Sequence, residues 1–257
     1  MIKVSNISVS FGGLRAVDNV NVEIPTGRIT GLIGPNGAGK TTLFNVIAGH
    51  IAASAGDIFL DGGVITKLKP HQRAARGLAR TFQIPQEFTR LTVLENLMAA
   101  ASQPVGENVF NVIFRRSCFR AEEEAIYHTA LETMSFLEIE RVSSEKAGNL
   151  SGGQKKLLEL GRALMRKPAV ILLDEVGAGI NRSLLSKIAE KIKLLNEERG
   201  LTFALIEHDL DFVSRLCDRV YVMAQGSVLA EGTVAEVRAD ERVIDAYFGG
   251  GKYEGRA

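Results

Sequence analysis

Apolar residues along this chain follow two different spacings, and the two spacings alternate. Alternating or continuous apolar runs predict strands at residues 2–11, 20–24, 29–33, 57–60, 169–173, 202–206 and 219–223. Apolar residues spaced three and four apart predict helices at residues 41–50, 152–167 and 182–198, with another short one after Asp209. Apolar strands that alternate with helices predict an α/β fold, in which a mostly parallel sheet is flanked by helices.

The middle of the chain departs from this alternation. The stretch "TVLENLMAAA" from Thr92 predicts a helix, and residues 102–117 contain Pro, Gly and Asn without a clear period. A second helix then aligns four apolar side chains on one face, those of Ile126, Ala130, Met134 and Leu137. Residues 85–150 are therefore predicted to be an inserted helical subdomain.

This insertion divides an α/β core formed by residues 1–84 and 151–248, so we expect a single domain over residues 1–248. The remaining stretch, "GGGKYEGRA" at 249–257, is rich in glycine and charge, and is predicted to be disordered. Its "GGGK" is not a phosphate loop, because neither a Ser/Thr nor a helix follows it.

Composition narrows the class of protein. The formal net charge is +1 without a dense Lys/Arg tract, so we expect no nucleic-acid partner. Cys118 and Cys217 lie far apart in unlike contexts, which argues against a disulfide framework or a cysteine zinc site and suits a reducing compartment. The longest apolar runs, "AVILL" and "LTFALI", are far shorter than the ~20 residues that span a bilayer. If this protein works at a membrane, something other than a membrane-spanning segment of these runs holds it there.

A glycine-rich loop follows the strand predicted at 29–33. The stretch "GPNGAGKTT" contains G-x-x-x-x-G-K-[ST] between an apolar strand and an amphipathic helix, the context that a phosphate-binding loop requires. Its glycines let successive N–H groups point into one concavity, which suits a polyphosphate. Lys40 is expected to bridge the β- and γ-phosphates, Thr41 to bind Mg²⁺ and Thr42 to reach the α-phosphate. The predicted nucleotide-binding residues are Gly34, Pro35, Asn36, Gly37, Ala38, Gly39, Lys40, Thr41 and Thr42.

Acidic residues end a second buried strand. Asp174 and Glu175 follow "AVILL", and ligands collect at the carboxyl ends of parallel strands. We expect Asp174 to hold Mg²⁺, through a water or by orienting Thr41, and Glu175 to polarise the attacking water. Two acids after a strand are often only a turn, but the phosphate loop favours the catalytic interpretation.

A histidine closes a third buried strand, in "LTFALIEHDL". Two interpretations of His208 stay open: a structural histidine followed by Asp209 as a helix N-cap, or a donor to the γ-phosphate. Even with this donor, the set lacks a cationic or dipolar group beyond the γ-phosphate. No strong arginine-finger candidate is identifiable in the sequence.

The stretch "NLSGGQKKLLELGRAL" is a second glycine turn that leads into an amphipathic helix. Ser151 and Gln154 fit a capping box, in which the N-cap and N3 side chains satisfy each other's backbone N–H groups. The same helix start also offers N–H groups and a dipole to a phosphate. Both interpretations are compatible, since the cap can present the loop.

Taken in order, five motifs resemble those of ATP-binding-cassette (ABC) ATPases, and the likeness covers nearly the whole chain. Residues 34–42 resemble the Walker A loop, Gln83 the Q-loop, "LSGGQ" the signature, Asp174–Glu175 the Walker B motif and His208 the switch histidine. The resemblance implies an ABC cassette with an N-terminal antiparallel β portion. It also implies that Phe11 stacks on adenine and that Gln83 joins Mg²⁺ to the helical subdomain.

In that family, two cassettes form a head-to-tail dimer, and the signature loop of one completes the ATP site of the other. The resemblance therefore assigns Ser151, Gly152, Gly153 and Gln154 to the partner's nucleotide, where the Ser151 hydroxyl, the Gly153 N–H and the helix dipole replace an arginine finger. Two departures matter: Val176 stands where a proline is usual, and Asn181 where many cassettes have Asp. Neither removes a catalytic group.

The stretches "SFGGLRAV", "RTFQIPQEFTRLTVLENLMAA", "AGIN" and "LAEGTVAEVRADERVIDAYFG" resemble the branched-chain amino-acid (leucine/isoleucine/valine) importers. The resemblance implies a second cassette, two transmembrane permease subunits, an external solute-binding protein, and a peripheral location on the cytoplasmic face of the membrane. Alternatives are a lipopolysaccharide-export or urea-import cassette, a cassette ATPase acting on DNA or ribosomes, and a small-molecule kinase. The kinase would not explain "LSGGQ" or "EHD".

Overall fold

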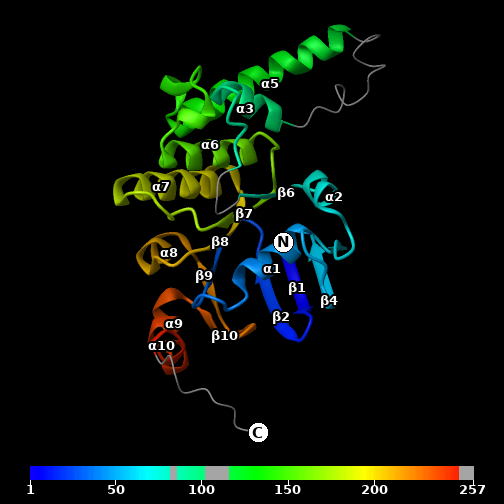
Figure 1. The fold of residues 1–257 in the computed structure, drawn as a ribbon, viewed down its shortest axis with the longest axis vertical. Coiled ribbons are helices and arrows are strands. Elements are labelled where there is room, and N and C mark those ends of the chain that lie inside the picture. Colours follow the sequence, from blue (N-terminus) through cyan, green and yellow to red (C-terminus); the bar gives the residue numbers. More distant parts are fainter. Residues whose placement is uncertain (82–85, 102–115, 249–257) are drawn as a thin grey trace. The chain divides into compact units, whose positions relative to one another are not determined.

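The computed structural model describes residues 1–81, 86–101 and 116–248 (Figure 1). Contacts between residues divide the chain into two units. One unit, called the core unit here, comprises Met1–Arg80, Ala169–Gly177 and Ile192–Ala257. The other, the helical unit, comprises Thr81–Pro168 and Ala178–Lys191. The helical unit thus extends beyond the predicted 85–150. Helix α7 (Arg182–Arg199) contributes to both units.

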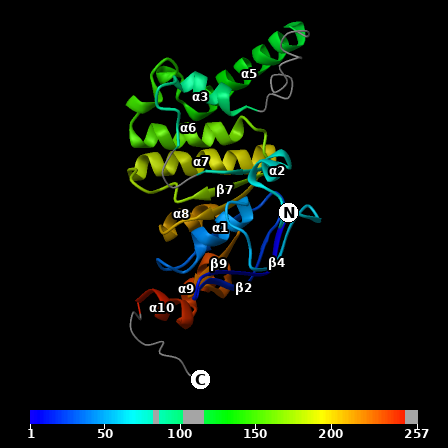
Figure 2. The same cartoon turned by 45° about the vertical axis from the view of Figure 1, so that its right-hand side comes forward.

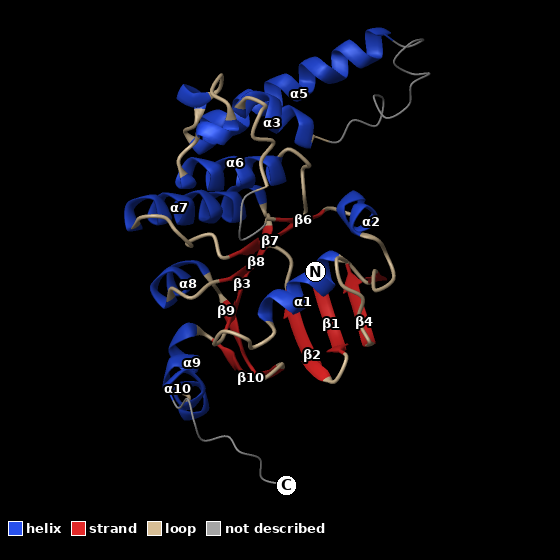
Figure 3. Cartoon of the chain, viewed as in Figure 1, coloured by secondary structure: helices blue, strands red, loops and turns tan. Residues whose placement is uncertain are grey.

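The N-terminal part of the core unit is a four-stranded antiparallel sheet with the order β2-β1-β4-β5 (Figure 3). In the central strand, Ile2 lies opposite both Ile24 and Leu60, and alternate residues of this strand are buried. The period of two places one face of the sheet against the core. The strands are β1 (Ile2–Phe11), β2 (Leu14–Ile24), β4 (Ala55–Leu60) and β5 (Gly63–Val64).

The second sheet of the core unit has six strands in the order β10-β9-β3-β8-β7-β6. All neighbouring strands are parallel except the pair β10–β9, and every residue of β3, β7 and β8 is buried. The predicted α/β fold with a mostly parallel sheet and an antiparallel N-terminal portion is therefore confirmed. The strands are β3 (Ile29–Ile33), β6 (Leu78–Arg80), β7 (Val170–Asp174), β8 (Thr202–Ile206), β9 (Arg219–Ala224) and β10 (Ser227–Gly232).

Helix α1 (Lys40–Ala48) lies between the two sheets (Figures 1 and 2). Its Leu43, Phe44 and Ile47 are each 1% exposed and share one hydrophobic cluster with residues of both sheets. Burying a side chain of this size contributes roughly 1.5–3 kcal/mol. This packing fixes the start of α1 relative to the carboxyl ends of the parallel strands.

The core unit contains further helices besides α1, and one of them, α8, packs closely on the six-stranded sheet. On the face of the six-stranded sheet opposite α1, a Cβ on Gly31 would lie 3.1 Å from the Cys217 sulfur and 3.3 Å from Val213. Even an alanine at 31 would therefore require these side chains to shift by a few tenths of an ångström. The helices are α2 (Pro70–Ala75), α8 (Leu210–Leu216), α9 (Val234–Ala239) and α10 (Glu241–Phe248).

The helical unit is held together by α3, α5 and α6. The four residues predicted to share one face of α5 are all buried, at 8% exposure or less. A Cβ on Gly161 of α6 would lie 2.9 Å from side-chain atoms of both Leu97 and Leu137, so a larger residue there would displace the ends of both leucine side chains. The helices are α3 (Val93–Ala100), α5 (Arg116–Leu137), η1 (Glu140–Val142), η2 (Ala147–Asn149) and α6 (Gly152–Leu164).

Contacts group α6 with the helices that precede it for a physical reason. The apolar side chains of α6 pack on α3 and α5, whereas the preceding sequence pattern marks only where α6 begins. None of the described helices is both long and apolar enough to cross a membrane. The irregular stretch 102–115 and the tail 249–257 lie outside the described residues.

Candidate nucleotide site

Three positions of the loop after β3 have a backbone conformation that favours glycine. Gly34, Gly37 and Gly39 all have positive φ, at 146°, 79° and 97°. A Cβ on Gly34 would lie 2.1 Å from the carbonyl oxygen of Met223, and one on Gly39 would lie 2.5 Å from that of Ala16. The glycines of the predicted pattern therefore let the loop lie directly on neighbouring backbone.

Helix α1 starts from this loop without a side-chain cap: Gly39 is its N-cap, and no side chain accepts from the first turn. An uncapped helix start combines N–H donors with the positive end of the helix dipole, and is suited to a phosphate. Lys40 is buried, and its Nζ donates to the carbonyl oxygens of Gly34 (2.7 Å) and Pro35 (2.9 Å). Burial lowers the pKa of Lys40, while Glu175 and Asp174 act in the opposite direction.

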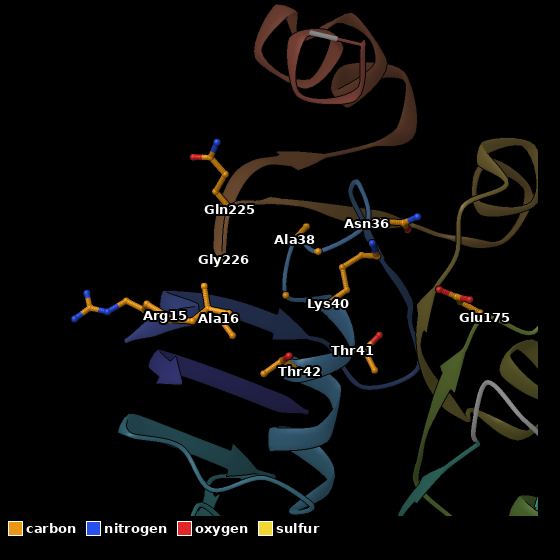
Figure 4. A pocket seen from close by; sticks show the side chains of 13 residues that line it. Arg15, Ala16, Asn36, Ala38, Lys40, Thr41, Thr42, Glu175, Gln225 and Gly226 are labelled. Atoms are coloured by element: carbon orange, nitrogen blue, oxygen red, sulfur yellow. The ribbon is translucent and has the colours of Figure 1, made fainter. Parts of the chain in front are cut away.

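A pocket of about 400 Å³ lies over this loop and is large enough for a small organic ligand. Figure 4 shows Glu175 facing Lys40 and Thr41 across it, with Arg15 and Gln225 on the other side of the loop. Its lining residues come from four segments: Leu14, Arg15, Ala16, Asn36, Gly37, Ala38, Gly39, Lys40, Thr41, Thr42, Glu175, Gln225 and Gly226.

Two of these segments carry no motif, and the sequence did not reveal them. Gly226, in the β9–β10 turn, donates its N–H to the Ala38 carbonyl (3.1 Å) and accepts from the Asp18 N–H (2.8 Å). These bonds tie the turn to both the phosphate loop and β2. The only local signals were the "AQGS" turn and the "GG" turn between the first two strands.

Phe11, predicted to stack on adenine, ends β1 and is 50% exposed. It pairs with Leu14, which lines the pocket, but Phe11 itself does not line it. Its role remains a prediction. Gln83 lies outside the described residues, so its predicted position is untested.

The acid at the end of β7 makes a contact that the sequence did not predict. Asp174 is 2% exposed and its Oδ2 accepts from Nη2 of Arg80 (2.8 Å) in β6. The same guanidinium donates through Nη1 to Oδ1 of Asn45 (2.6 Å) in α1. Arg80 thus joins β6, β7 and α1 beneath the site. Nothing in "GLARTFQ" distinguishes this arginine from a surface one.

Glu175 and His208 lie together at the carboxyl ends of the adjacent strands β7 and β8. Nε2 of His208 is 2.8 Å from Oε1 of Glu175. Glu175 has a φ of 50°, and its N–H donates to the Ile206 carbonyl (3.0 Å). Asp209 accepts from the N–H groups of Asp211 and Phe212, so its predicted N-cap role is confirmed.

The second glycine turn, at the start of α6, belongs to the helical unit. Ser151 Oγ accepts from the Gln154 N–H (3.3 Å), and Gln154 Oε1 accepts from the Ser151 N–H (2.9 Å). The predicted capping box is confirmed. Ser151 and Gly152 are exposed, and a Cβ on Gly153 would lie 1.8 Å from Leu184. This glycine therefore allows α6 to pack on α7.

The donor set suits magnesium held mainly by phosphate oxygens. Within the described residues, no group of three or more His, Cys, Asp or Glu side chains could hold a metal by itself. Mg²⁺ in nucleotide sites keeps waters and takes one or two protein ligands beside the phosphates, so the Thr41 hydroxyl and an Asp174 that acts through water fit it. Arg80 on Oδ2 disfavours direct bidentate binding by Asp174. The arrangement of strand β3, loop, uncapped helix and acids at the carboxyl end of β7 defines a P-loop nucleotide-binding domain.

Comparisons with known proteins identify the family to which this P-loop domain belongs. A family model described as ABC transporter matches residues 17–178, and one described as branched-chain amino acid ATP-binding cassette transporter matches residues 227–253. The chain is 40% identical over 249 residues to a probable branched-chain amino acid transport ATP-binding protein LivG of Archaeoglobus fulgidus, covering 97% of this chain and 95% of that protein. It is 36% identical over 249 residues to the BraF protein of Pseudomonas aeruginosa, a high-affinity branched-chain amino acid transport ATP-binding protein (97% and 98%).

Solved structures of ATP-binding cassettes have the same fold as this chain. A nucleotide-free ATP-binding cassette from an ABC transporter superposes with a TM-score of 0.84 at 38% identity, covering 96% of this chain and 98% of that one. A dimeric post-hydrolysis state of the cassette MJ0796, bound to ADP and Pi, gives 0.75 at 26% identity (91% and 99%). The chain therefore belongs to the ABC transporter family, among the branched-chain amino acid transport ATP-binding proteins. It is an ATPase with the ABC cassette fold.

Proposed function

We propose that this ATPase powers the uptake of branched-chain amino acids as the ATP-binding subunit of a membrane transporter. The observation that carries this proposal is similarity to LivG and BraF over nearly the full length of each chain, including the C-terminal segment that matches the branched-chain family. Two transmembrane permease subunits would hold it at the cytoplasmic face of the membrane. An external solute-binding protein would deliver the solute, which no residue of this chain contacts.

The geometry supports a division of roles within the nucleotide pocket. The loop 34–39 and the start of α1 hold the phosphates, and Lys40 exchanges its bonds to the loop carbonyls for the β- and γ-phosphates. Thr41, Asp174 through a water, and Gln83 would hold Mg²⁺, which supplies charge neutralisation at the phosphates. Thr42 would reach the α-phosphate, and Phe11 the adenine. Glu175 orients the attacking water from the edge of the pocket, where it faces Lys40.

His208 begins in contact with Glu175 and would turn to the γ-phosphate when ATP is bound. The rotation frees the Glu175 carboxylate for water and brings a donor to the phosphate. Phosphoryl transfer depends mainly on such positioning and on charge stabilisation.

A second cassette would complete the site. Ser151, Gly152, Gly153 and Gln154 of one subunit would face the γ-phosphate held by the other, with Ser151 Oγ and the Gly153 N–H as donors. Support comes from the exposure of Ser151 and Gly152 and from the dimer formed by the related cassette MJ0796. The second cassette is either another copy of this chain or a related subunit.

The ATPase part is tested with Glu175→Gln. We expect ATP binding to persist, hydrolysis to fall about 10²–10⁴-fold as for loss of a general base, and an ATP-bound dimer to accumulate in gel filtration. Normal hydrolysis by this variant would overturn the role of Glu175. A strictly monomeric profile with ATP, for this variant alone and mixed with a co-purified partner cassette, would overturn the dimeric site.

Ser151→Arg tests the contribution across the dimer. The variant should bind ATP as a monomer with wild-type affinity but fail to dimerise or hydrolyse, because arginine replaces a small donor at the proposed interface. Lys193→Ala, at an exposed lysine outside the loop, serves as the control. Normal hydrolysis by Ser151→Arg would show that the loop does not act on a partner's nucleotide.

The solute is tested in proteoliposomes that contain this chain with its membrane subunits and solute-binding protein. Leucine, isoleucine and valine should stimulate ATP hydrolysis, whereas urea should not. Stimulation by urea alone, or by none of these solutes in a complex that hydrolyses ATP, would contradict the substrate assignment but leave the ATPase intact.

A further inference from the structure

Glu207, between β8 and His208, carries a buried carboxylate that the roles above do not use. It is 4% exposed, and burial raises its pKa, as does nearby Glu175. Among the described residues, none of the salt bridges involves Glu207. A carboxylate is expensive to bury, so filling space does not explain its presence.

Its hydrogen bonds connect the two segments that carry the reacting side chains. Oε1 of Glu207 accepts from the N–H of Gly177, two residues after Glu175, at 2.7 Å. Oε2 accepts from the N–H of His208 at 3.3 Å. One side chain thus joins the turn after β7 to the turn after β8.

The bond from Gly177 continues a tie that the sheet begins. The Glu175 N–H donates to the Ile206 carbonyl at 3.0 Å, the last backbone bond between these segments. Beyond it, neither turn is held by the ladder. Glu207 adds a second crosslink, and the Glu175–His208 side-chain contact at 2.8 Å lies beside it.

We propose that Glu207 is a positioning residue for ATP hydrolysis: its side chain fixes the backbone after Glu175 against the backbone of His208, and so sets where these two groups meet the nucleotide. The proposal rests on the proposed roles of Glu175 and His208. It requires the length of the glutamate side chain and an acceptor oxygen at its end. The crosslink itself needs one acceptor oxygen, for the Gly177 N–H, because the longer bond to the His208 N–H joins adjacent residues of the same turn.

Two variants separate length from charge. Glu207→Gln keeps the length and one carbonyl oxygen for the Gly177 N–H but loses the acceptor for the His208 N–H, whereas Glu207→Asp keeps the charge but falls short by one methylene. We expect Glu207→Asp to lower kcat by up to about 10²-fold, as for misplacement of catalytic groups by about 1 Å. Glu207→Gln should keep kcat within about threefold, and neither variant should change the KM for ATP or its Kd by more than about twofold.

Glu231→Ala is the control, since Glu231 pairs with Arg219 at the exposed surface of β10. Measurements use the full chain in its ATP-dependent assembly, with melting temperatures for all variants. An unchanged kcat in Glu207→Asp would overturn the proposal, as would a loss of kcat in Glu207→Gln equal to that in Glu207→Asp. So would losses accompanied by a matching rise in KM and fall in melting temperature.

Glu175→Gln, measured alongside, separates the two claims. If it abolishes hydrolysis while Glu207→Asp has no effect, Glu175 keeps its role and only the positioning proposal fails. If Glu175→Gln hydrolyses ATP normally, the proposed function fails first.

Discussion

Two helices of this protein begin at a glycine-rich loop, and their first turns are built differently. α1 starts after Gly39, which has a φ of 97° and offers no side chain to the helix. α6 starts after Ser151, whose side chain and that of Gln154 satisfy each other's backbone N–H groups. The first helix start is left open to an anion, and the second satisfies its own donors.

The difference also extends to the neighbouring cation. Lys40, the first residue of α1, is buried and held by two carbonyls of its own loop. Lys155, near the start of α6, instead forms an ion pair with Glu87. A glycine loop before a helix is therefore not a phosphate site by itself. An open first turn and a lysine that lines the pocket over it suit α1 to bind a phosphate within one chain, whereas α6 would act only on a partner's nucleotide.

Of the substitutions that test this comparison, Lys40→Ala should have the largest effect, a loss of ATP affinity. Losing a charge-assisted hydrogen bond costs about 1.5–3 kcal/mol, so ATP affinity should fall roughly 10–100-fold. Isothermal titration of the monomer measures it. The matched variant at the other loop, Lys155→Gln, keeps a donor for Glu87 and should leave the affinity unchanged. Equal losses in both variants would mean that both loops bind nucleotide within one chain.

Gly39→Ala tests the open turn. The substitution forces alanine into a left-handed conformation, at a cost of about 1–2 kcal/mol, and places Cβ against the Ala16 carbonyl. Urea denaturation should show at least this loss of stability, and ATP binding should weaken because the loop must move. Wild-type stability in this variant would show that the loop backbone relaxes without strain.

Ser151→Ala tests the closed turn. Removing an N-cap side chain costs typically about 1 kcal/mol, while Ser151→Asn should retain the cap. Thermal or urea unfolding of the two variants measures the difference. ATP affinity of the monomer should stay at the wild-type value in both, and a drop in affinity would place Ser151 in its own chain's nucleotide site.

Gly152→Ala should have the smallest effect. A Cβ at this position meets open space, and the backbone is not left-handed. Alanine at a compatible glycine position stabilises by about 0.4–1 kcal/mol through the unfolded state. Destabilisation in urea would show that the first residue of α6 is more constrained than the capping box requires, and would weaken the contrast with Gly39.

The local features of the site could be predicted from sequence because each depends on a few adjacent residues. The glycines at 34, 37 and 39, the Ser151 cap and the Asp209 cap all follow from backbone geometry within one turn. The face of α5 follows from helical period. Strand ends could likewise be read from the apolar runs that precede Glu175 and His208.

Contacts between distant segments could not be predicted in this way. Arg80 on Asp174 and Glu207 on Gly177 join residues 94 and 30 positions apart. Arg15 and Gln225 line one side of the pocket because the fold brings the β9–β10 turn and the start of β2 beside the phosphate loop. The packing of α6 on α3 and α5, which groups α6 with the helical unit, likewise joins segments that are distant in the sequence.

The sequence by itself determined the α/β class, the phosphate loop, the acids at the strand ends and both helix caps, since spacing and local conformation are written in neighbouring residues. Only the tertiary structure decided that Arg15 and Gln225 line the pocket, which carboxylate pairs with Arg80 and which one ties the turn after Glu175 to that of His208. Those choices depend on burial and strand order, because a buried charge or N–H must find its partner wherever the folded chain brings one close.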